Sequence, residues 1–290
     1  MKNTLNKIAR DTNIYLKKFI NKQGNSRLVP AIKYGLFPGG KKIRSKILID
    51  IGSLLSINYK TLIAIGSAVE CIHAYSLIHD DLPCMDDDKI RRGKLSTHVK
   101  FGESTAVLAG NSLQIIACEI LASPGLNIKE KTKISLIKKL SECSGHLGIA
   151  GGQYLDLSYE KKKISKNKII EMEKKKTGKL FSFCLYAVGV LANKNKKEKN
   201  LLGKLGEEIG LLFQLSDDFL DVKGSKKLIG KQIKKDNKKG KSTLINLMGF
   251  EKANDYANNL KKKILLKLEK HGKNAKDLID TIKFIQERNF

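Results

Sequence analysis

The stretch LLGKLGEEIGLLFQLSDDFLD (residues 201–221) shows most clearly which fold class the chain adopts. Apolar residues recur in it at intervals of three and four, which is the period of a helix, and not at the interval of two that marks a strand. The same pattern occurs in residues 62–79 and 104–121. Segments 64–78 and 181–191 are apolar nearly all round, as expected of helices inside a bundle. The sequence therefore predicts an all-α fold.

The chain has 290 residues, which suits one large domain or two small ones of about 150 residues each. Gly and Pro interrupt the helical pattern at several points, among them Pro83 and Gly151-Gly152. We find no repeat of fixed period and no long low-complexity linker. We therefore expect a single domain over residues 1–290.

The composition excludes several protein classes. Hydrophobic residues make up 41% of the chain and only 4 residues are Pro, which argues against a disordered or collagen-like protein. The 5 cysteines form no Cys-x-x-Cys pair, so neither a disulfide framework nor a zinc site is indicated. We see no run of about 20 uncharged apolar residues and no signal-peptide core. These features predict a cytoplasmic protein with no integral membrane segment.

The chain is strongly basic, with 56 Lys and Arg against 29 Asp and Glu and a net charge of +27. A basic surface attracts nucleic acids and anionic membranes. The excess is mostly Lys, however, and it is spread over segments such as 161–163, 174–176 and 261–263, without interleaved aromatic residues on which bases could stack. Solvated helix faces explain this pattern better, and we predict no nucleic-acid partner.

The acidic residues are concentrated, since 8 of the 15 Asp lie in residues 80–88 and 217–221. Asp217 and Asp221 are one helical turn apart and share a face with Gln214. Pro83 forces a turn that could bring Asp86 back beside Asp80. Clustered carboxylates repel one another unless a positive charge lies between them, and Mg²⁺ prefers such hard oxygen ligands. Each cluster taken alone could also be a run of solvated or capping carboxylates.

Basic residues accompany the acidic clusters. Residues 39–44, GGKKIR, open a predicted helix, whose free amides favour an anion. Arg91 and Arg92 follow the first acidic cluster, and Lys231 and Lys241 follow the second. Magnesium with two separate sets of cations suits two diphosphates, one bound through metal and one bound directly.

Two segments carry a resemblance to a known family. Residues 80–93, DDLPCMDDDKIRRG, and 210–221, GLLFQLSDDFLD, resemble the two aspartate-rich motifs of the trans-isoprenyl diphosphate synthases, and the bacterial farnesyl type is the nearest pattern. The match extends over residues 39–44, 70–79, 151–157 and 176–178. It implies an all-α, single-domain bundle around a central active-site cavity, usually a homodimer. Lys42 stands where Arg is usual, which leaves the geometry of its loop open.

Position by position, the resemblance implies three groups of site residues. Magnesium would be held by Asp80, Asp86 and Asp217, supported by Asp81, Asp218 and Asp221. The allylic diphosphate would be contacted by Arg91, Lys176, Thr177, Gln214, Lys231 and Lys241. Isopentenyl diphosphate would be held by Lys41, Arg44, His73 and Arg92. Asp80, Asp86, Asp217 and Lys176 would carry the catalysis.

The resemblance implies that the enzyme condenses isopentenyl diphosphate with dimethylallyl and then geranyl diphosphate to form farnesyl diphosphate. The allylic C–O bond would ionise, the isopentenyl double bond would attack the cation, and a proton would leave. Tyr75 lies five residues, or about 7.5 Å, before Asp80 along the helix, and Ser76 lies four residues before it. Both would end the cavity for the growing tail. Tyr75 could also be an ordinary core aromatic.

Four other readings remain at this point. A synthase of geranylgeranyl or longer products would share the fold. A basic nucleic-acid or anionic-surface binder would not need inward-facing carboxylates. A catalytically silent partner subunit would be expected to lose one acidic cluster, and a terpene cyclase would typically lack the second cluster and the Gly-Gly-Lys segment.

Overall fold

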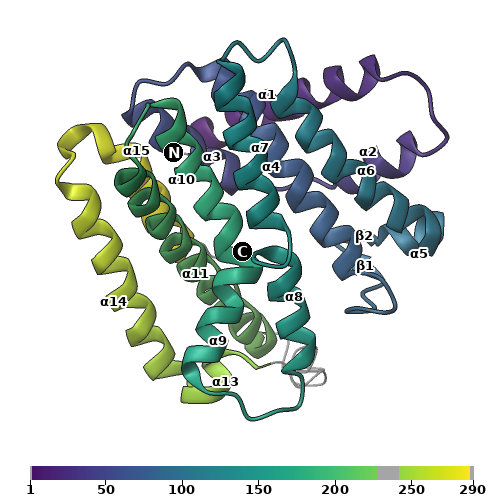
Figure 1. Cartoon of the computed structure of the whole chain (residues 1–290). Coiled ribbons are helices and arrows are strands. Elements are labelled where there is room, and N and C mark those ends of the chain that lie inside the picture. The colour runs from purple at the N-terminus through teal and green to yellow at the C-terminus, as the bar shows by residue number, and fades with distance from the viewer. Residues whose placement is uncertain (1, 228–241, 288–290) are drawn as a thin grey trace. The chain divides into compact units, whose positions relative to one another are not determined.

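The computed structural model describes residues 2–227 and 242–287, and Figure 1 shows that helices dominate them. Within these ranges the strands are limited to the hairpin β1 (Ile90–Arg91) and β2 (Lys94–Leu95), which is antiparallel with Arg91 opposite Lys94. The prediction of an all-α fold is confirmed. The hairpin itself was not predicted, because two-residue strands leave no periodicity to detect.

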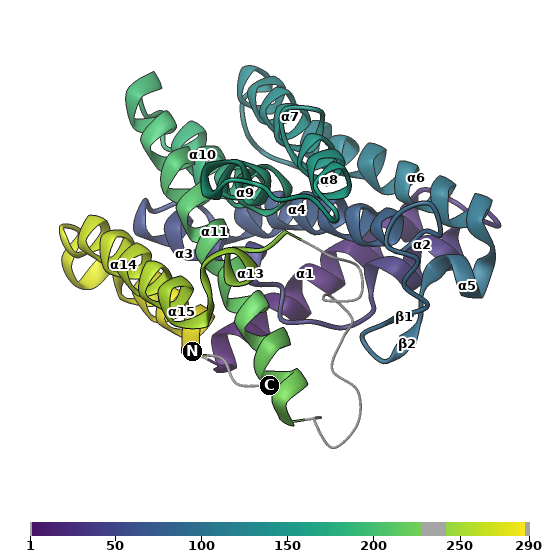
Figure 2. The ribbon, with the colours of Figure 1, turned by 90° about the horizontal axis from the view of Figure 1, so that it is seen from below.

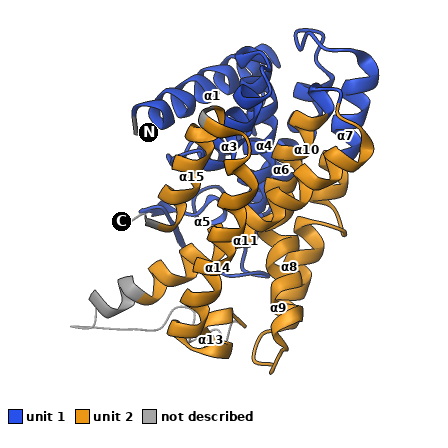
Figure 3. Ribbon diagram, turned by 90° about the vertical axis from the view of Figure 1, so that its left-hand side faces the viewer, with its two compact units in different colours: residues 1–139, 190–193 blue, residues 140–189, 194–290 orange. Residues whose placement is uncertain are grey.

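The helices divide into two compact units, which Figure 3 colours separately. Unit 1 comprises residues 1–139 and 190–193, and unit 2 comprises residues 140–189 and 194–290. α7 (Glu130–Ser144) and α10 (Lys179–Leu191) contribute residues to both. The single domain over residues 1–290 stays a prediction.

Unit 1 is built around one long apolar helix. Its helices include α1 (Lys2–Lys22), α2 (Val29–Leu36), α3 (Ile43–Leu54), α4 (Tyr59–Asp80), α5 (Thr97–Phe101) and α6 (Glu103–Ala122). α4 is the central one, and it packs against α1, α2, α3 and α6. Asn58 begins α4 by accepting hydrogen bonds from the amides of Lys60 and Thr61. The burial of α4 fixes where its last residues, Asp80 and the residues after it, emerge.

Two glycines allow close packing against α4. A methyl group on Gly110 of α6 would overlap the imidazole ring of His79, and one on Gly52 of α3 would overlap the side chain of Leu62. The hairpin is fastened to the same unit, because the Tyr34 hydroxyl of α2 donates a hydrogen bond to the Leu95 carbonyl at 2.7 Å. Figure 2 shows the hairpin at one end of unit 1.

Two helices of unit 1 are longer apolar segments than the sequence analysis recognised. By length and composition, α4 and α6 are apolar enough to cross a membrane. The most apolar window of α4 is 78% buried in the protein, as in the core helix of a globular unit, whereas that of α6 is 44% buried. The sequence analysis overlooked both, since isolated polar residues interrupt their apolar runs.

Unit 2 consists of shorter helices around one long helix. These are α8 (Ile149–Ser158), α9 (Lys166–Glu173), the π-helix η1 (Lys174–Gly178), α11 (Lys196–Lys227), α13 (Leu244–Met248), α14 (Phe250–Glu269), the 3₁₀-helix η2 (Gly272–Ala275) and α15 (Lys276–Glu287). η1 approaches α11 through glycines, because a Cβ on Gly210 would lie 2.6 Å from the Gly178 Cα. This close approach sets Thr177 beside α11.

α3 carries an ion pair that is removed from water. Lys46 and Asp50 lie one turn apart, and their side chains are 2% and 3% exposed. The ammonium and the carboxylate bind one another. Desolvation of both charges costs several kcal/mol, which their attraction only offsets while both are present.

We predict that Lys46→Met lowers the free energy of unfolding by about 3–5 kcal/mol, because Asp50 would stay buried without its compensating charge. Adding Asp50→Leu to this variant should recover most of the loss, because a well-packed apolar pair replaces the ion pair. Urea denaturation of the three proteins measures the effect. If Lys46→Met unfolds at the same urea concentration as the wild type, the predicted loss of stability is wrong.

Candidate active site

The first acidic cluster forms a tight turn at the end of α4. Asp80 is the last residue of α4, and its carbonyl accepts a hydrogen bond from the Asp86 amide at 2.9 Å. The Asp87 amide binds the Leu82 carbonyl at 3.0 Å, and Asp87 adopts a positive φ of 48°. The prediction that the turn at Pro83 returns Asp86 to Asp80 is confirmed.

Arg91 of the hairpin holds this turn from the side. Its guanidinium donates from Nε to Asp81 Oδ1 at 2.9 Å, with a second bond from Nη2, and it lies 3.3 Å from Asp88 Oδ2. Burial raises the pKa of Asp81 in spite of the opposing effect of Arg91. In this structure the predicted substrate-binding residue Arg91 therefore braces the acidic turn.

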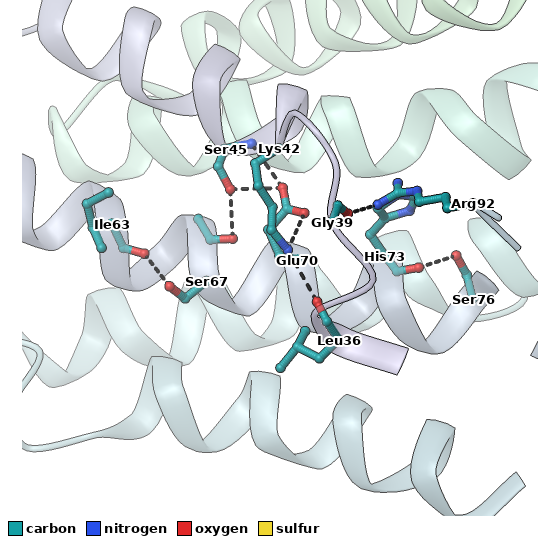
Figure 4. Close-up of polar contacts among 11 residues, drawn as sticks. Leu36, Gly39, Lys42, Ser45, Ile63, Ser67, Glu70, His73, Ser76 and Arg92 are labelled. Carbon is teal, nitrogen blue, oxygen red and sulfur yellow. Dashed lines mark hydrogen bonds and ion pairs between the residues drawn. The ribbon is translucent and has the colours of Figure 1, made fainter. Parts of the chain in front are cut away.

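The predicted anion-binding loop, residues 39–42, has an unusual backbone. Gly39, Gly40 and Lys42 have φ values of 88°, 121° and 50°, and α3 begins immediately afterwards. A methyl group on Gly40 would overlap the guanidinium of Arg92, whose Nη1 donates to the Gly39 carbonyl (Figure 4). The two glycines thus let the loop and Arg92 meet. Lys41, between them and Lys42, is exposed.

His73 lies among the cations of this loop. Removal of the ring from water lowers the pKa of His73 well below its ordinary value, and the positive charges of Arg44, Arg92, Lys42 and Arg91 lower it further. The structure therefore brings His73, Arg44 and Arg92 together, as predicted for one subsite. His73 is neutral at pH 7, so it offers hydrogen bonds and not charge.

Lys176 and Thr177 lie on the π-helix η1, an irregularity that is frequent at functional sites. Lys176 Nζ binds Asp156 Oδ2 of α8 at 2.6 Å. The Thr177 hydroxyl donates to Gln214 Oε1 at 2.9 Å, and Gln214 Nε2 donates to Asp218 Oδ1 at 2.9 Å. Unit 2 thus joins the predicted residues Thr177, Gln214 and Asp218 in one chain of hydrogen bonds.

Two acidic residues of unit 2 were missed by the sequence analysis as site residues. Asp156 pairs with Lys176, and Glu173 of α9 is 4% exposed. Burial raises the pKa of Glu173 well above its ordinary value, and the negative charges of Asp218 and Asp156 add to this. Asp156 lies in residues 151–157, which the resemblance covered without giving Asp156 a role, and Glu173 lies three residues before Lys176.

The remaining predicted residues differ in exposure. Asp217 is half-buried on α11, and Asp221, one turn later, is exposed. Lys231 and Lys241 lie outside the described residues.

The Tyr75 ring is 6% exposed and packs edge-on against His79, with ring centroids 5.5 Å apart. Burial, helped by Asp80, raises the pKa of Tyr75 to about 12. The Ser76 hydroxyl donates to the His73 carbonyl at 2.9 Å.

The carboxylates fit magnesium by chemistry, because Asp80, Asp86 and Asp217 offer hard oxygen ligands. Within residues 2–227 and 242–287, no three acidic, His or Cys side chains are gathered closely enough to hold a metal ion by themselves. Fewer than three protein ligands is common for Mg²⁺, which takes further oxygens from water and from substrate phosphates.

We predict that wild-type protein loses stability relative to His73→Gln as the pH falls from about 7.5 to about 5.5. The folded state keeps the His73 ring neutral, whereas the unfolded chain protonates it below about pH 6.5, so the unfolded state gains protons. Urea denaturation at several pH values measures the difference. His271→Gln, at an exposed histidine, is the comparison variant. Parallel pH profiles for wild type and His73→Gln would refute the assignment.

Comparison with known proteins identifies the family. Residues 25–282 match the family model described as polyprenyl synthetase. The farnesyl diphosphate synthase of Escherichia coli (strain K12) is 41% identical over 239 residues, which are 81% of this chain and 80% of that protein.

Two solved structures are similar throughout. An FPP/GFPP synthase from Zymomonas mobilis superimposes with a TM-score of 0.86 at 32% identity, covering 98% of both chains. A geranyltransferase from Helicobacter pylori, complexed with magnesium and isoprenyl diphosphate, gives a TM-score of 0.77 at 28% identity, covering 97% of this chain and 95% of that one. The chain therefore belongs to the polyprenyl synthetase family.

Proposed function

We propose that the protein is a farnesyl diphosphate synthase, which transfers dimethylallyl and then geranyl groups to isopentenyl diphosphate. The main observation in favour of this proposal is that a carboxylate of each acidic cluster accepts a hydrogen bond from a predicted site residue. Arg91 donates to Asp81, and Gln214 donates to Asp218. The farnesyl diphosphate synthases among its relatives, at 37–41% identity over most of the chain, support the same reaction.

The reaction needs a leaving diphosphate, a nucleophilic alkene and a base. The allylic C–O bond breaks with its electron pair passing to diphosphate, the isopentenyl double bond forms the new C–C bond, and the resulting cation loses a proton. Magnesium, when bound, supplies Lewis-acid stabilisation of the leaving diphosphate. Lys176 adds positive charge near the allylic diphosphate, and the Thr177–Gln214 pair orients hydrogen bonds there.

We assign the second diphosphate to the cationic loop of unit 1. Lys41, Arg44 and Arg92 would bind it by charge, and the neutral His73 by a hydrogen bond. On the allylic side the proposal includes Arg91, which would exchange part of its contact with Asp81 for the substrate, and also Lys231 and Lys241. Residues that hold each diphosphate directly bring the reacting carbons together and exclude water from the cation.

The magnesium assignment comes from the carboxylate chemistry and from the relative of Helicobacter pylori that was complexed with the metal. Asp80, Asp86 and Asp217 would hold the ions, while Asp81, Asp218 and Asp221 support them. The reaction requires no membrane, and we place it in the cytoplasm.

We predict that Asp80→Ala and Asp217→Ala each lower turnover by at least about 100-fold while the helical circular dichroism is unchanged, because each removes a metal ligand. Turnover is measured with purified protein, magnesium, dimethylallyl diphosphate and labelled isopentenyl diphosphate. Asp255→Ala, at an exposed carboxylate of α14, is the matched control. Near-normal activity of either site variant at saturating magnesium would refute the assignment.

A second copy of the chain is the protein partner that we propose. α6 leaves Val107, Leu108 and Ile115 exposed, with Ile115 at 62% exposure. These residues span little more than two turns and lie on one side of the helix. An apolar stripe of this kind is typical of a subunit interface, and it supports a homodimer.

The second candidate function is a synthase of longer products. It is suggested by the structural similarity to the FPP/GFPP synthase of Zymomonas mobilis. Tyr75 favours the fifteen-carbon product, because its buried ring lies on α4 little more than one turn before Asp80. A basic surface binder and a silent partner subunit explain the braced acidic clusters less well. A terpene cyclase is disfavoured by the Gly-Gly-Lys loop.

We predict that Tyr75→Ala releases products that are longer by at least one five-carbon unit, because the space of the ring becomes available to the growing tail. Products are resolved by chain length after the same assay. Tyr154→Ala, which removes a tyrosine that is 71% exposed, should leave the product unchanged. An active Tyr75→Ala enzyme that makes only the fifteen-carbon product would show that Tyr75 does not limit the chain.

A further inference from the structure

Glu70 is the only acidic residue of α4 before Asp80, in a helix that is otherwise apolar around it. Its side chain is 3% exposed. A carboxylate so deeply buried is stable only if partners compensate for the lost water. Figure 4 shows these partners, and all of them come from the start of α3.

Glu70 acts as the N-terminal cap of α3. Lys42 occupies the N-cap position but makes no hydrogen bond from its side chain to the first turn. Instead, Glu70 Oε1 accepts the backbone amide of Ser45, the third residue of α3, at 3.3 Å, and its distance to the Ser45 hydroxyl is 2.9 Å. A carboxylate at this place satisfies a helix amide that has no partner within the helix, and it is attracted by the helix dipole.

Glu70 also holds the residue that enters α3. Lys42 has a left-handed backbone with φ of 50°, which costs about 1–2 kcal/mol in a residue other than Gly. Its ammonium group lies 3.5 Å from Glu70 Oε2 and 3.5 Å from the Leu36 carbonyl, and its side chain is 8% exposed. The ion pair and the carbonyl contact retain this strained conformation.

The start of α3 also packs closely against α4 at Gly66. The Ser45 hydroxyl is 3.2 Å from the Gly66 carbonyl, one turn before Glu70, and a Cβ on Gly66 would lie 3.1 Å from Ser45 Oγ. α3 therefore begins at a fixed point on α4. His73 follows Glu70 by three residues on α4, on the side that faces Arg92 in Figure 4.

We propose that Glu70 is a positioning residue for isopentenyl diphosphate: by capping α3 and pairing with Lys42, it fixes Lys41 and Arg44, which flank Lys42, next to His73. This inference rests on the proposed function, since it takes that diphosphate as the ligand of the loop. It also explains why Lys can replace Arg at position 42. The side chain there binds Glu70 and the Leu36 carbonyl at the end of α2, so only its charge and reach are used.

The sign of one measurement separates positioning from simple electrostatics. A carboxylate close to a bound diphosphate repels it, so Glu70→Gln would lower KM for isopentenyl diphosphate if charge alone mattered. If Glu70 positions the loop, the same variant raises this KM by about tenfold and leaves KM for the allylic substrate within about twofold. Glu70→Asp, which keeps the charge, should restore part of the affinity.

Lys42→Gln breaks the same ion pair from the other partner and should raise the same KM, which keeps the test valid if Glu70→Gln fails to fold. Ser67→Ala is the control, because Ser67 is buried on α4 but its hydroxyl bonds only to Ile63 of its own helix among the contacts of Figure 4. It should match wild type in both KM values.

Calorimetric titration with isopentenyl diphosphate alone measures the affinity without turnover. Weaker binding in Glu70→Gln and Lys42→Gln, with the fold intact, supports the inference. An unchanged or lowered KM for isopentenyl diphosphate, or an equal rise in both KM values, overturns it. If wild type binds isopentenyl diphosphate but forms no condensation product, the proposed function fails while the positioning by Glu70 can still be read from the titration.

Discussion

Clustered carboxylates repel one another, and the structure depends on how each of them is balanced. Asp81 is held by Arg91, Asp156 by Lys176, and Asp218 by the amide of Gln214. Arg91 comes from the hairpin and Lys176 from the π-helix, whereas Gln214 lies one turn before Asp218 on α11 itself. Two of the three balancing groups therefore depend on a neighbouring element of the same unit. Burial of Asp81 and Glu173 raises their pKa and makes this balance more necessary.

Close approach of helices makes the balance possible. Gly52 and Gly110 let α3 and α6 contact α4, and Gly178 and Gly210 bring η1 against α11. A larger side chain at any of these positions would separate the helices and move the polar groups that they carry. Rigid packing of the apolar faces thereby fixes a few polar side chains at the helix ends accurately enough for them to form hydrogen bonds.

The cations near the acidic clusters and in the Gly-Gly-Lys loop have different surroundings in the structure. Arg91 and Lys176 are paired with carboxylates, whereas Lys41 is exposed to solvent. Lys42 stands in the same loop but is buried against Glu70. The sequence alone does not separate these surroundings, because they depend on which residues the fold brings next to each cation.

The sequence by itself determined the helical class, the two acidic clusters and the tight return of Asp86 to Asp80, since these follow from local periodicity and from Pro83. It could not reveal that Glu70 caps another helix, that Glu173 lies near Asp156 and Asp218, or that Arg91 braces Asp81. These contacts join residues from different helices or from a helix and the hairpin. Only the tertiary structure decides them, because they depend on how packed helices place their ends in space, which local residue preferences do not specify.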